Sequence, residues 1–272
     1  MSDTYQPLRD LIGRTGIPFQ LAVENAMRTV GATYGIEVVQ REVPWANGFI
    51  DIIVKSSERV FCAVECKRVT DKSWSFVLTG NSKESATRCR IECFNGNAGK
   101  RAGQSRVFCS EWNMMEPSPE SEFCILPKDT PIGSLESVCK DLLASCHNLL
   151  ENEDELLLNN EYALMIPVIV TNAKLYTCKL NVDSISLETG LPAEASTEFK
   201  PVEMIRFRKS LVNRRSNSYQ TSPMVLSDWT VDRERTVFVV SPPAIDRFFA
   251  GFRSLAPATF QGIPNEFLNP PS

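Results

Sequence analysis

Three charged side chains interrupt two apolar segments between residues 48 and 67. Asp51 stands between two isoleucines in the run Gly48–Lys55, and Glu65 and Lys67 lie at the end of the run Val60–Lys67. Side chains along a strand alternate between its two faces, so Glu65 and Lys67 project from the same face. A charge within an apolar strand is costly unless it is paired or binds a metal. Two acids and one amine at this place therefore need a chemical explanation.

The residue types allow two interpretations. In the first, Asp51 and Lys67 form an ordinary ion pair across a hairpin, and Glu65 is solvated at a sheet edge. In the second, Asp51, Glu65 and the backbone carbonyl of Cys66 supply hard oxygen ligands of the kind that Mg²⁺ prefers. Lys67 would then orient or deprotonate a water molecule and stabilise charge on a phosphate. We favour the metal site and keep the ion pair as the alternative.

Local elements must bring these residues together. The two β-branched runs flank Ser56-Ser57-Glu58-Arg59, which predicts a hairpin. Pro18 suits the first turn of an amphipathic helix over residues 18–34, where apolar residues recur every three or four positions. Glu24 lies at the border of its apolar stripe, where it could reach the sheet or remain solvated. A strand over residues 36–43 follows, which gives the order helix, strand, strand, strand.

The run from Asp51 through a hairpin to Glu65-Cys66-Lys67 resembles the PD-(D/E)XK motif of the restriction-endonuclease-like nucleases. The resemblance covers about residues 15–75, and Ile50 stands where the name of the motif has proline. Members of this family use a metal to hydrolyse phosphodiester bonds. The resemblance therefore implies Mg²⁺ as the cofactor, with Mn²⁺ able to substitute.

The resemblance also implies a role for each matching residue. Asp51, Glu65 and the backbone carbonyl of Cys66 would bind the metal, and Lys67 would serve the attacking water. Many family members carry a further glutamate on the first helix, and Glu24 stands in the corresponding place. It would hold a second metal or a metal-bound water. The implied catalytic set is Glu24, Asp51, Glu65 and Lys67.

The resemblance and the order of elements predict an α/β fold with a restriction-endonuclease-like core. In that fold, helices flank a central mixed β-sheet. We expect residues 1–180 to form the nuclease-like core and residues 181–272 to form a C-terminal strand and helix extension, packed on the same domain. Further predicted elements are a helix capped by Ser134, a hairpin of strands 162–171 and 175–180, strands near 204–212 and 236–240, and a helix from Pro242 to Phe252. Pro167 predicts a bulge or an edge position for its strand.

The formal net charge of −4 does not by itself indicate a nucleic-acid-binding protein, but its distribution is uneven. Residues 67–109 contain nine Lys or Arg and three Asp or Glu, whereas residues 111–161 contain two Lys and twelve Asp or Glu. Such asymmetry is typical of one face that tolerates phosphate and another that repels it or meets a partner. The basic segment 95–104 could clamp a phosphodiester backbone or be an ordinary surface loop. The candidate phosphate contacts in this region are Arg68, Lys72, Lys100 and Arg101.

A second basic stretch, residues 206–215, contains five Lys or Arg and no acid. Alternation places Arg206 and Arg208 on one face of a strand, and Lys209 follows them. Exposed arginines at this density favour contact with phosphate. The alternative is that they pair with the acidic residues of 111–161, within the chain or in a second subunit.

The composition is ordinary for a globular protein, with 43% hydrophobic and 23% charged residues. No apolar run reaches about 18 residues and the first residues lack a signal-peptide pattern, so we expect a cytoplasmic protein without a membrane partner. Nine cysteines, an odd number, favour reduced thiols over a disulfide framework. Cys89, Cys93, Cys109 and Cys124 could together hold zinc, although their spacing is irregular.

Three functions are compatible with these patterns. We favour a Mg²⁺-dependent endodeoxyribonuclease, with DNA preferred to RNA, acting as the nuclease subunit of a phage-defence or restriction system. The alternative is a catalytically silent nucleic-acid-binding or scaffolding subunit with the same fold. The third is an unrelated α/β interaction module. The chain shows no separate recognition module, which suggests that a helicase or sensor protein supplies targeting, and a homo-oligomer is also compatible with the sequence.

Overall fold

The structure is a computed structural model of the 272-residue chain. It describes residues 5–45, 48–57, 59–70, 72–79, 82–95, 107–128, 133–152, 162–192, 197–212, 233–252 and 255–257. Strands make up more than half of the described residues. Within the described part of the chain, no helix combines the length and hydrophobicity needed to cross a membrane.

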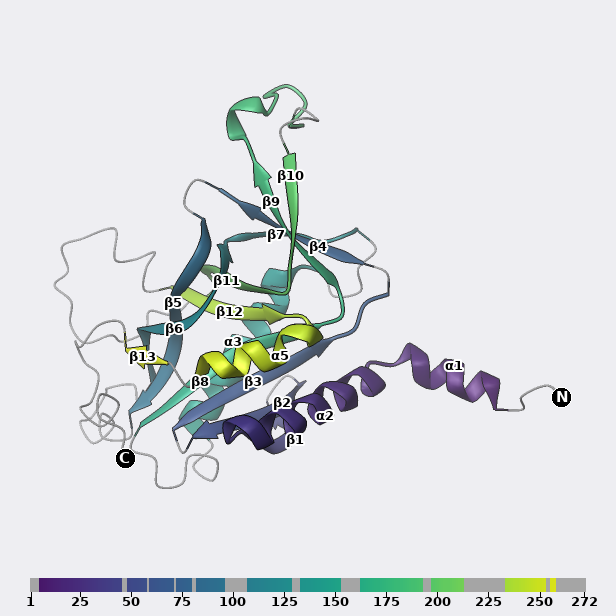
Figure 1. The fold of residues 1–272 in the computed structure, drawn as a ribbon, viewed down its shortest axis with the longest axis vertical. Coiled ribbons are helices and arrows are strands. Elements are labelled where there is room, and N and C mark those ends of the chain that lie inside the picture. The colour runs from purple at the N-terminus through teal and green to yellow at the C-terminus, as the bar shows by residue number, and fades with distance from the viewer. Residues whose placement is uncertain are drawn as a thin grey trace.

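The described elements comprise four α-helices, two short 3₁₀ helices and thirteen strands (Figure 1). The helices are α1 (Gln6–Arg14), α2 (Ile17–Tyr34), η2 (Val182–Ser184), α3 (Leu135–Asn152), η4 (Pro242–Ala244) and α5 (Ile245–Phe252). The strands are β1 (Glu37–Trp45), β2 (Gly48–Ser57), β3 (Val60–Lys67), β4 (Ser73–Leu78), β5 (Lys83–Asn95), β6 (Val107–Ser121), β7 (Phe123–Ile125), β8 (Tyr162–Thr171), β9 (Lys174–Leu180), β10 (Thr197–Val202), β11 (Met204–Ser210), β12 (Glu234–Val240) and β13 (Ala256–Pro257).

Five strands close into a β-barrel. Going round the ring, β8 pairs with β12, β12 with β11, β11 with β6, β6 with β5, and β5 returns to β8. The antiparallel strands β1, β2 and β3 extend this sheet, because β3 pairs with β8 in parallel on its other side. The hairpin that carries the candidate site thus continues directly from the barrel wall.

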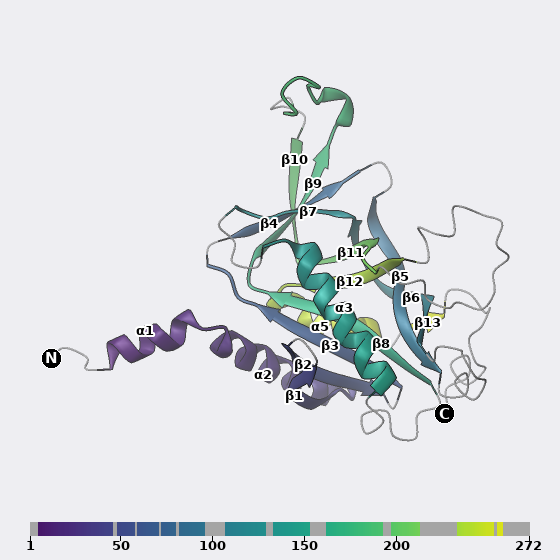
Figure 2. The ribbon, with the colours of Figure 1, turned by 180° about the vertical axis from the view of Figure 1, so that it is seen from behind.

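Helices cover both faces of the sheet. Apolar residues of α2 and α5 form one core cluster with strand residues such as Ile52, Val64 and Phe238. Apolar residues of α3 form the other cluster, with Ile53, Ala63 and their neighbours. Figure 1 shows α2 and α5 on the near side, and Figure 2 shows α3 on the side behind them. Alternation along β2 and β3 therefore sends successive side chains toward different helices.

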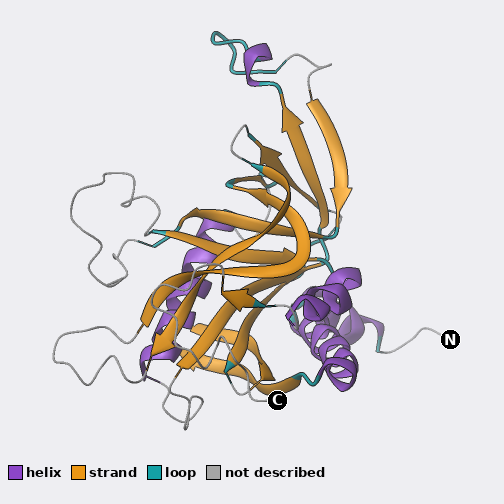
Figure 3. Ribbon diagram, turned by 60° about the vertical axis from the view of Figure 1, so that its left-hand side comes forward, coloured by secondary structure: helices purple, strands orange, loops and turns teal. Residues whose placement is uncertain are grey.

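A second, four-stranded sheet has the order β10, β9, β4, β7. Its strands β9 and β10 form an antiparallel arm that projects from the rest of the molecule (Figure 3). At the tip of the arm, Ile185 and Pro192 form an isolated bridge. The inner end of this sheet packs into the α3-side core through Trp74, Phe76 and Leu175.

The predicted fold class is wrong. The protein is mostly β with a closed five-stranded barrel, whereas the prediction was an α/β, restriction-endonuclease-like core with an open sheet flanked by helices. The reason lies in two long strands, β5 and β6, that the sequence did not reveal. Residues 68–109 look irregular because they are basic and contain glycine, and β6 contains two prolines. Pairing of β5 with both β6 and β8 closes the ring.

The predicted hairpin of residues 162–171 and 175–180 is also wrong, because β8 and β9 belong to different sheets. Asn172 fixes the turn between them: its Oδ1 accepts a hydrogen bond from the Val69 N–H at 2.7 Å, and its Nδ2 donates to the Val69 carbonyl at 2.8 Å. This contact directs the chain into the second sheet. The individual strands, the helix α3 with its Ser134 cap, and the helix α2 are confirmed.

Pro167 does not mark an edge strand, because β8 lies in the centre of the sheet between β3 and its barrel neighbours. The partner of β8 on the barrel side changes along its length. Residues 162–165 pair with β5, and residues 168–170 pair with β12. Pro167 falls in the interval between these partners, where a missing N–H costs no ladder hydrogen bond on that side.

Candidate functional site

The hairpin β2–β3 places Asp51, Glu65 and Lys67 together, as the sequence predicts. Ile52 pairs with Val64, and the next opposed positions in this antiparallel register are Asp51 and Glu65. Directly opposed residues share a face, and Lys67 shares it with Glu65 because the two are separated by one residue. Ala63, two residues before Glu65, packs in the α3-side core. The three charges therefore project on the face covered by α3.

Short hydrogen bonds fix this arrangement. The backbone N–H of Cys66 donates to Asp51 Oδ2 at 2.6 Å, and Lys67 Nζ donates to Glu65 Oε1 at 2.6 Å. The side chain of Gln20 on α2 donates to the backbone carbonyl of Asp51 at 3.2 Å. The site is thus held from both strands and from the first turn of the buried helix.

Burial and repulsion by a neighbouring carboxylate act on both acids. Burial raises the pKa of Asp51 above its usual value, against the opposing effects of the Cys66 N–H and the Lys67 charge. Burial also raises the pKa of Glu65, and the nearby charge of Asp51 adds to it, while Lys67 opposes both. Two acids that share one amine and little water disfavour their charged forms. A bound cation would remove that penalty.

The ion-pair interpretation describes only part of the site. Lys67 pairs with Glu65 and not with Asp51, although its charge also acts on Asp51. Lys67 and Glu65 are both partly buried, with 25% and 18% of their side chains exposed. Two further carboxylates repel the two acids and raise their pKa values: Glu42 acts on Asp51, and Asp141 acts on Glu65. The local charge is therefore negative after pairing.

Glu24 does not join this group in the described structure. Its carboxylate accepts hydrogen bonds from Arg28 on the same helix, at 2.8 Å and 3.0 Å, and lies 3.5 Å from Arg41 Nη1. Arg41 is opposite Ile52, whose side chain packs on the α2 side of the sheet. Glu24 and the acid pair thus lie on opposite faces of the sheet. Its predicted role at a second metal finds no support in these contacts.

The donor set suits a hard cation that keeps part of its hydration. Among the described residues, no three His, Cys, Asp or Glu side chains come close enough to hold a metal by themselves. Mg²⁺, however, is usually bound through one or two carboxylates, with water and substrate phosphate completing its coordination. Asp51 and Glu65 fit that requirement, and the Cys66 carbonyl stays a prediction as a third ligand.

The predicted phosphate contacts near the hairpin have different outcomes. Arg68 directly follows the site and is exposed, and its contact with phosphate stays a prediction. Lys72 is half-buried at the start of the second sheet, where its carbonyl accepts a hydrogen bond from the Lys174 N–H. Lys100 and Arg101 lie outside the described residues.

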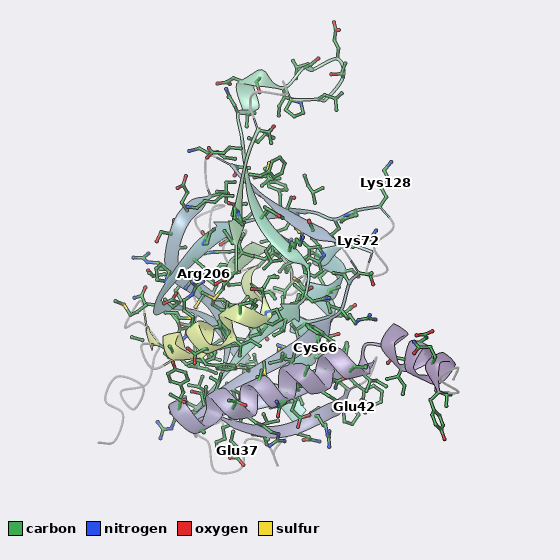
Figure 4. The ribbon with its side chains drawn as sticks, turned by 45° about the vertical axis from the view of Figure 1, so that its right-hand side comes forward. Glu37, Glu42, Cys66, Lys72, Lys128 and Arg206 are labelled. Carbon is green, nitrogen blue, oxygen red and sulfur yellow. The ribbon has the colours of Figure 1, made fainter. Side chains whose placement is uncertain are left out.

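The second group of predicted phosphate contacts has a structural role instead. Arg206 is fully buried, donates to the Ser118 side chain and to the Met114 and Glu116 carbonyls, and lies over the ring of Phe238. A side chain so enclosed cannot reach a phosphate. Figure 4 shows Arg206 well apart from Cys66 and hence from the hairpin site.

Arg208 and Lys209 are likewise engaged within the chain. Arg208 forms ion pairs with Glu111, Glu120 and Glu234, and Lys209 Nζ lies 3.0 Å from Glu136 Oε1. Three of these four acids belong to the acidic region 111–161. The alternative noted from the sequence, internal pairing of the two charge blocks, is the arrangement found. The contacts of Arg208 link β11 to β6 and β12, and the contact of Lys209 links β11 to α3.

Three polar neighbours of the site were not among the predicted site residues: Gln20, Glu42 and Asp141. The position of Glu42 could have been found by counting residues along the paired strands, because β1 pairs with β2 so that Glu42 is opposite Asp51. Its φ of 49° lies in the left-handed region, which is unusual for a residue with a side chain. Asp141 comes from α3, 76 positions from Glu65, and no local pattern connects the two.

The cysteines are reduced and mostly buried. All nine are free, and Cys62 is buried on the α2 side while Cys66 is partly buried against the same core, opposite Glu65 as predicted. Burial raises the pKa of Cys89 to about 12, so its thiol is not ionised at neutral pH. Cys89, Cys93 and Cys109 lie on β5 and β6, whereas Cys124 lies on β7 of the other sheet.

Comparisons of the chain with protein-family models, with curated proteins and with solved structures found no match, and so nothing in them identifies a PD-(D/E)XK nuclease.

Proposed function

We propose that the protein is a metal-dependent nuclease that hydrolyses phosphodiester bonds, with DNA as the favoured substrate. The observation that carries the proposal is the convergence of Asp51, Glu65 and Lys67 on one face of the β2–β3 hairpin. The proposal rests on this site and its resemblance to the PD-(D/E)XK motif, and not on the fold, which is different. A phage-defence or restriction setting, with a helicase or sensor as partner, is part of the proposal by analogy alone.

Asp51 and Glu65 would hold the cation, with the Cys66 carbonyl as a further ligand. A bound Mg²⁺ supplies a Lewis acid that neutralises phosphate charge and favours ionisation of a water molecule. Lys67 binds the phosphate oxygens or the attacking water, and Glu65 fixes its ammonium group by the 2.6 Å hydrogen bond. Arg68, exposed beside Lys67, extends the positive charge along the substrate backbone.

In the hydrolysis, the water oxygen forms a bond to phosphorus and the bond from phosphorus to one ester oxygen breaks. The proton of the water is transferred to solvent, and the leaving oxygen takes up a proton from solvent. The side chains of the site would orient the water in line with the leaving oxygen and keep it out of unproductive positions. Partial burial of both acids and the amine serves that purpose.

The test is cleavage of supercoiled plasmid, linear DNA and RNA by the purified protein with Mg²⁺, Mn²⁺ or a chelator. Wild type should nick at least one substrate, and only when metal is present. Glu65→Ala and Glu65→Gln should nick none of the substrates. Glu37→Ala is the matched control, because Glu37 is an exposed acid on β1 at the other end of the strand from Glu42 (Figure 4). It should cut like wild type.

Equal cleavage by wild type and both Glu65 variants would refute the proposed site. No cleavage by wild type with either metal would refute the proposed activity. Metal-independent binding of DNA without cleavage would favour the silent binding subunit instead.

A further inference from the structure

The N-terminal helix α1 carries an apolar stripe that the fold leaves in water. Leu8, Leu11 and Ile12 recur at spacings of three and four, and Tyr5 lies one turn before Leu8. Each of the four residues is between 56% and 64% exposed. Such a stripe normally faces a core, but here no core covers it.

Two further exposed apolar residues lie in the first turns of α2. Ile17 and Leu21 are 56% and 46% exposed, just beyond the extended residue Thr15 that separates the two helices. Of the fifteen large hydrophobic residues that are exposed in the described chain, six lie within residues 5–21. We call this surface the N-terminal stripe: Tyr5, Leu8, Leu11, Ile12, Ile17 and Leu21. So dense a group of exposed apolar residues within one short segment indicates an interaction site and not scattered surface residues.

Helix α1 has little to stabilise it within one chain. It is nine residues long, shorter than the roughly 12–15 residues at which isolated helices become marginally stable in water. No side chain caps its N-terminus. Figures 1 and 2 show it extending away from the body of the molecule. Burial of its apolar side against something outside the chain would provide the missing stabilisation.

We propose that the N-terminal stripe docks against the same stripe of a second copy of this chain, in a symmetric dimer. A two-fold axis through α1 brings identical surfaces together, and an apolar stripe is complementary to itself without any need for opposite charge. The projection of α1 leaves room for a second body. The polar pair on α1, Gln6 and Asp10, bond to each other at 2.8 Å and so do not require a charged partner.

The available area supports a dimer of moderate affinity. Six large side chains, each about half exposed, offer on the order of 550 Å² per copy, and two copies would bury roughly 1,100 Å², which is near the lower limit for specific interfaces. Dimerisation should therefore depend on protein concentration, and its detection does not depend on nuclease activity.

Sedimentation velocity of the full chain over a wide concentration range tests the proposal. The wild-type mass should rise with concentration toward twice the 30.5 kDa of one chain. Leu11→Glu with Ile12→Glu should stay monomeric at every concentration, with an unchanged near-UV circular dichroism spectrum because both positions are exposed. The matched control, Leu187→Glu with Leu191→Glu, alters two leucines on the arm that are more exposed than Leu11 and Ile12, and it should dimerise like wild type.

A wild type that remains monomeric at the highest concentration overturns the proposal, whether α1 then binds lipid vesicles, another protein or nothing. Dimerisation of the Leu11/Ile12 variant to the same extent as wild type also overturns it, because the seam would then lie elsewhere. A quenching assay with a dye attached near Tyr5 gives a second readout: mixing labelled copies should bring two dyes together only when the stripe is intact.

Discussion

Charged residues interrupt apolar strands in two places, the β2–β3 hairpin and the barrel wall around Arg206, and the two places differ in how their charges are balanced. In the barrel, Arg206 and Arg208 find hydrogen-bond or ion-pair partners on β6 and β12. On the hairpin, Asp51 and Glu65 share one amine, and burial raises the pKa of both acids. Figure 4 shows that the two places are separate.

The difference separates a structural charge from a candidate functional one. A buried arginine that donates to several carbonyls fixes the geometry of a barrel, and removing it leaves those acceptors without a partner. Partly buried acids with too few partners cost stability and persist where a ligand or reaction uses them. Both places put charged side chains in strands, so their surroundings, and not their position in a strand, distinguish them.

The largest expected effect is on catalysis at the hairpin. Lys67→Ala and Glu65→Gln should each reduce metal-dependent cleavage on the order of 1,000-fold, because each removes a charge that acts on the reacting phosphate or its metal. Initial rates of plasmid nicking measure this. Lys209 lies in the barrel region and pairs with Glu136, so Lys209→Ala should cleave within about twofold of the wild-type rate. A loss in Lys209→Ala as large as that in the hairpin variants would show that the hairpin charges have no special role.

The next effect is on stability in the barrel. Arg206→Ala should lower the free energy of unfolding by about 3–5 kcal/mol, because it leaves buried acceptors on β6 unpaired and opens a cavity. Urea denaturation followed by tryptophan fluorescence measures the change. Arg88→Ala, at an exposed ion pair with Glu111, should cost less than about 1 kcal/mol. Equal costs for the two variants would show that Arg206 is not structural.

Removal of one hairpin acid should stabilise the metal-free protein. The pKa of Asp51 is raised in the folded state, so ionisation of Asp51 at neutral pH opposes folding. That cost disappears as the pH falls toward the pKa of an aspartate in the unfolded chain, which is about 4. Asp51→Asn should therefore raise the melting temperature by roughly 2 °C at pH 7 and leave it unchanged near pH 4. A lower melting temperature at pH 7 would mean that Asp51 supports the fold in the way Arg206 does.

The smallest effect is expected at Glu24. Its partners Arg28 and Arg41 are largely exposed, so Glu24→Gln should cost less than about 1 kcal/mol of stability. Because Glu24 lies on the opposite face of the sheet, the variant should cleave within about threefold of wild type. A loss as large as that of Glu65→Gln would restore Glu24 to the catalytic set.

The local elements of the site could be read from the sequence, while the fold around it could not. Alternation in residues 48–67 and the apolar periodicity of α2 follow from short-range geometry, and they predicted the hairpin and the helix correctly. The barrel depends on β5 and β6, where prolines and charges hide the strand pattern. The pairing of β5 with β8 and of β6 with β11 is long-range and leaves no local signal.

The same limit applies to single residues. Asp51, Glu65 and Lys67 could be associated because one turn connects their strands. The partners of Arg206 lie 88 to 92 positions away, so the sequence could not show that this arginine is enclosed. Charge density alone suggested phosphate contacts there, but the acids that neutralise it come from another part of the chain.

Isothermal titration of Mn²⁺ into the wild type and into Asp51→Asn with Glu65→Gln tests most directly whether a cation completes the hairpin site. The wild type should bind Mn²⁺ with saturable heat and should gain melting temperature as the metal is added. The double variant should show neither effect, and Glu37→Gln should match the wild type. Equal binding by the wild type and the double variant, or no binding by either, would contradict a metal centre at Asp51 and Glu65.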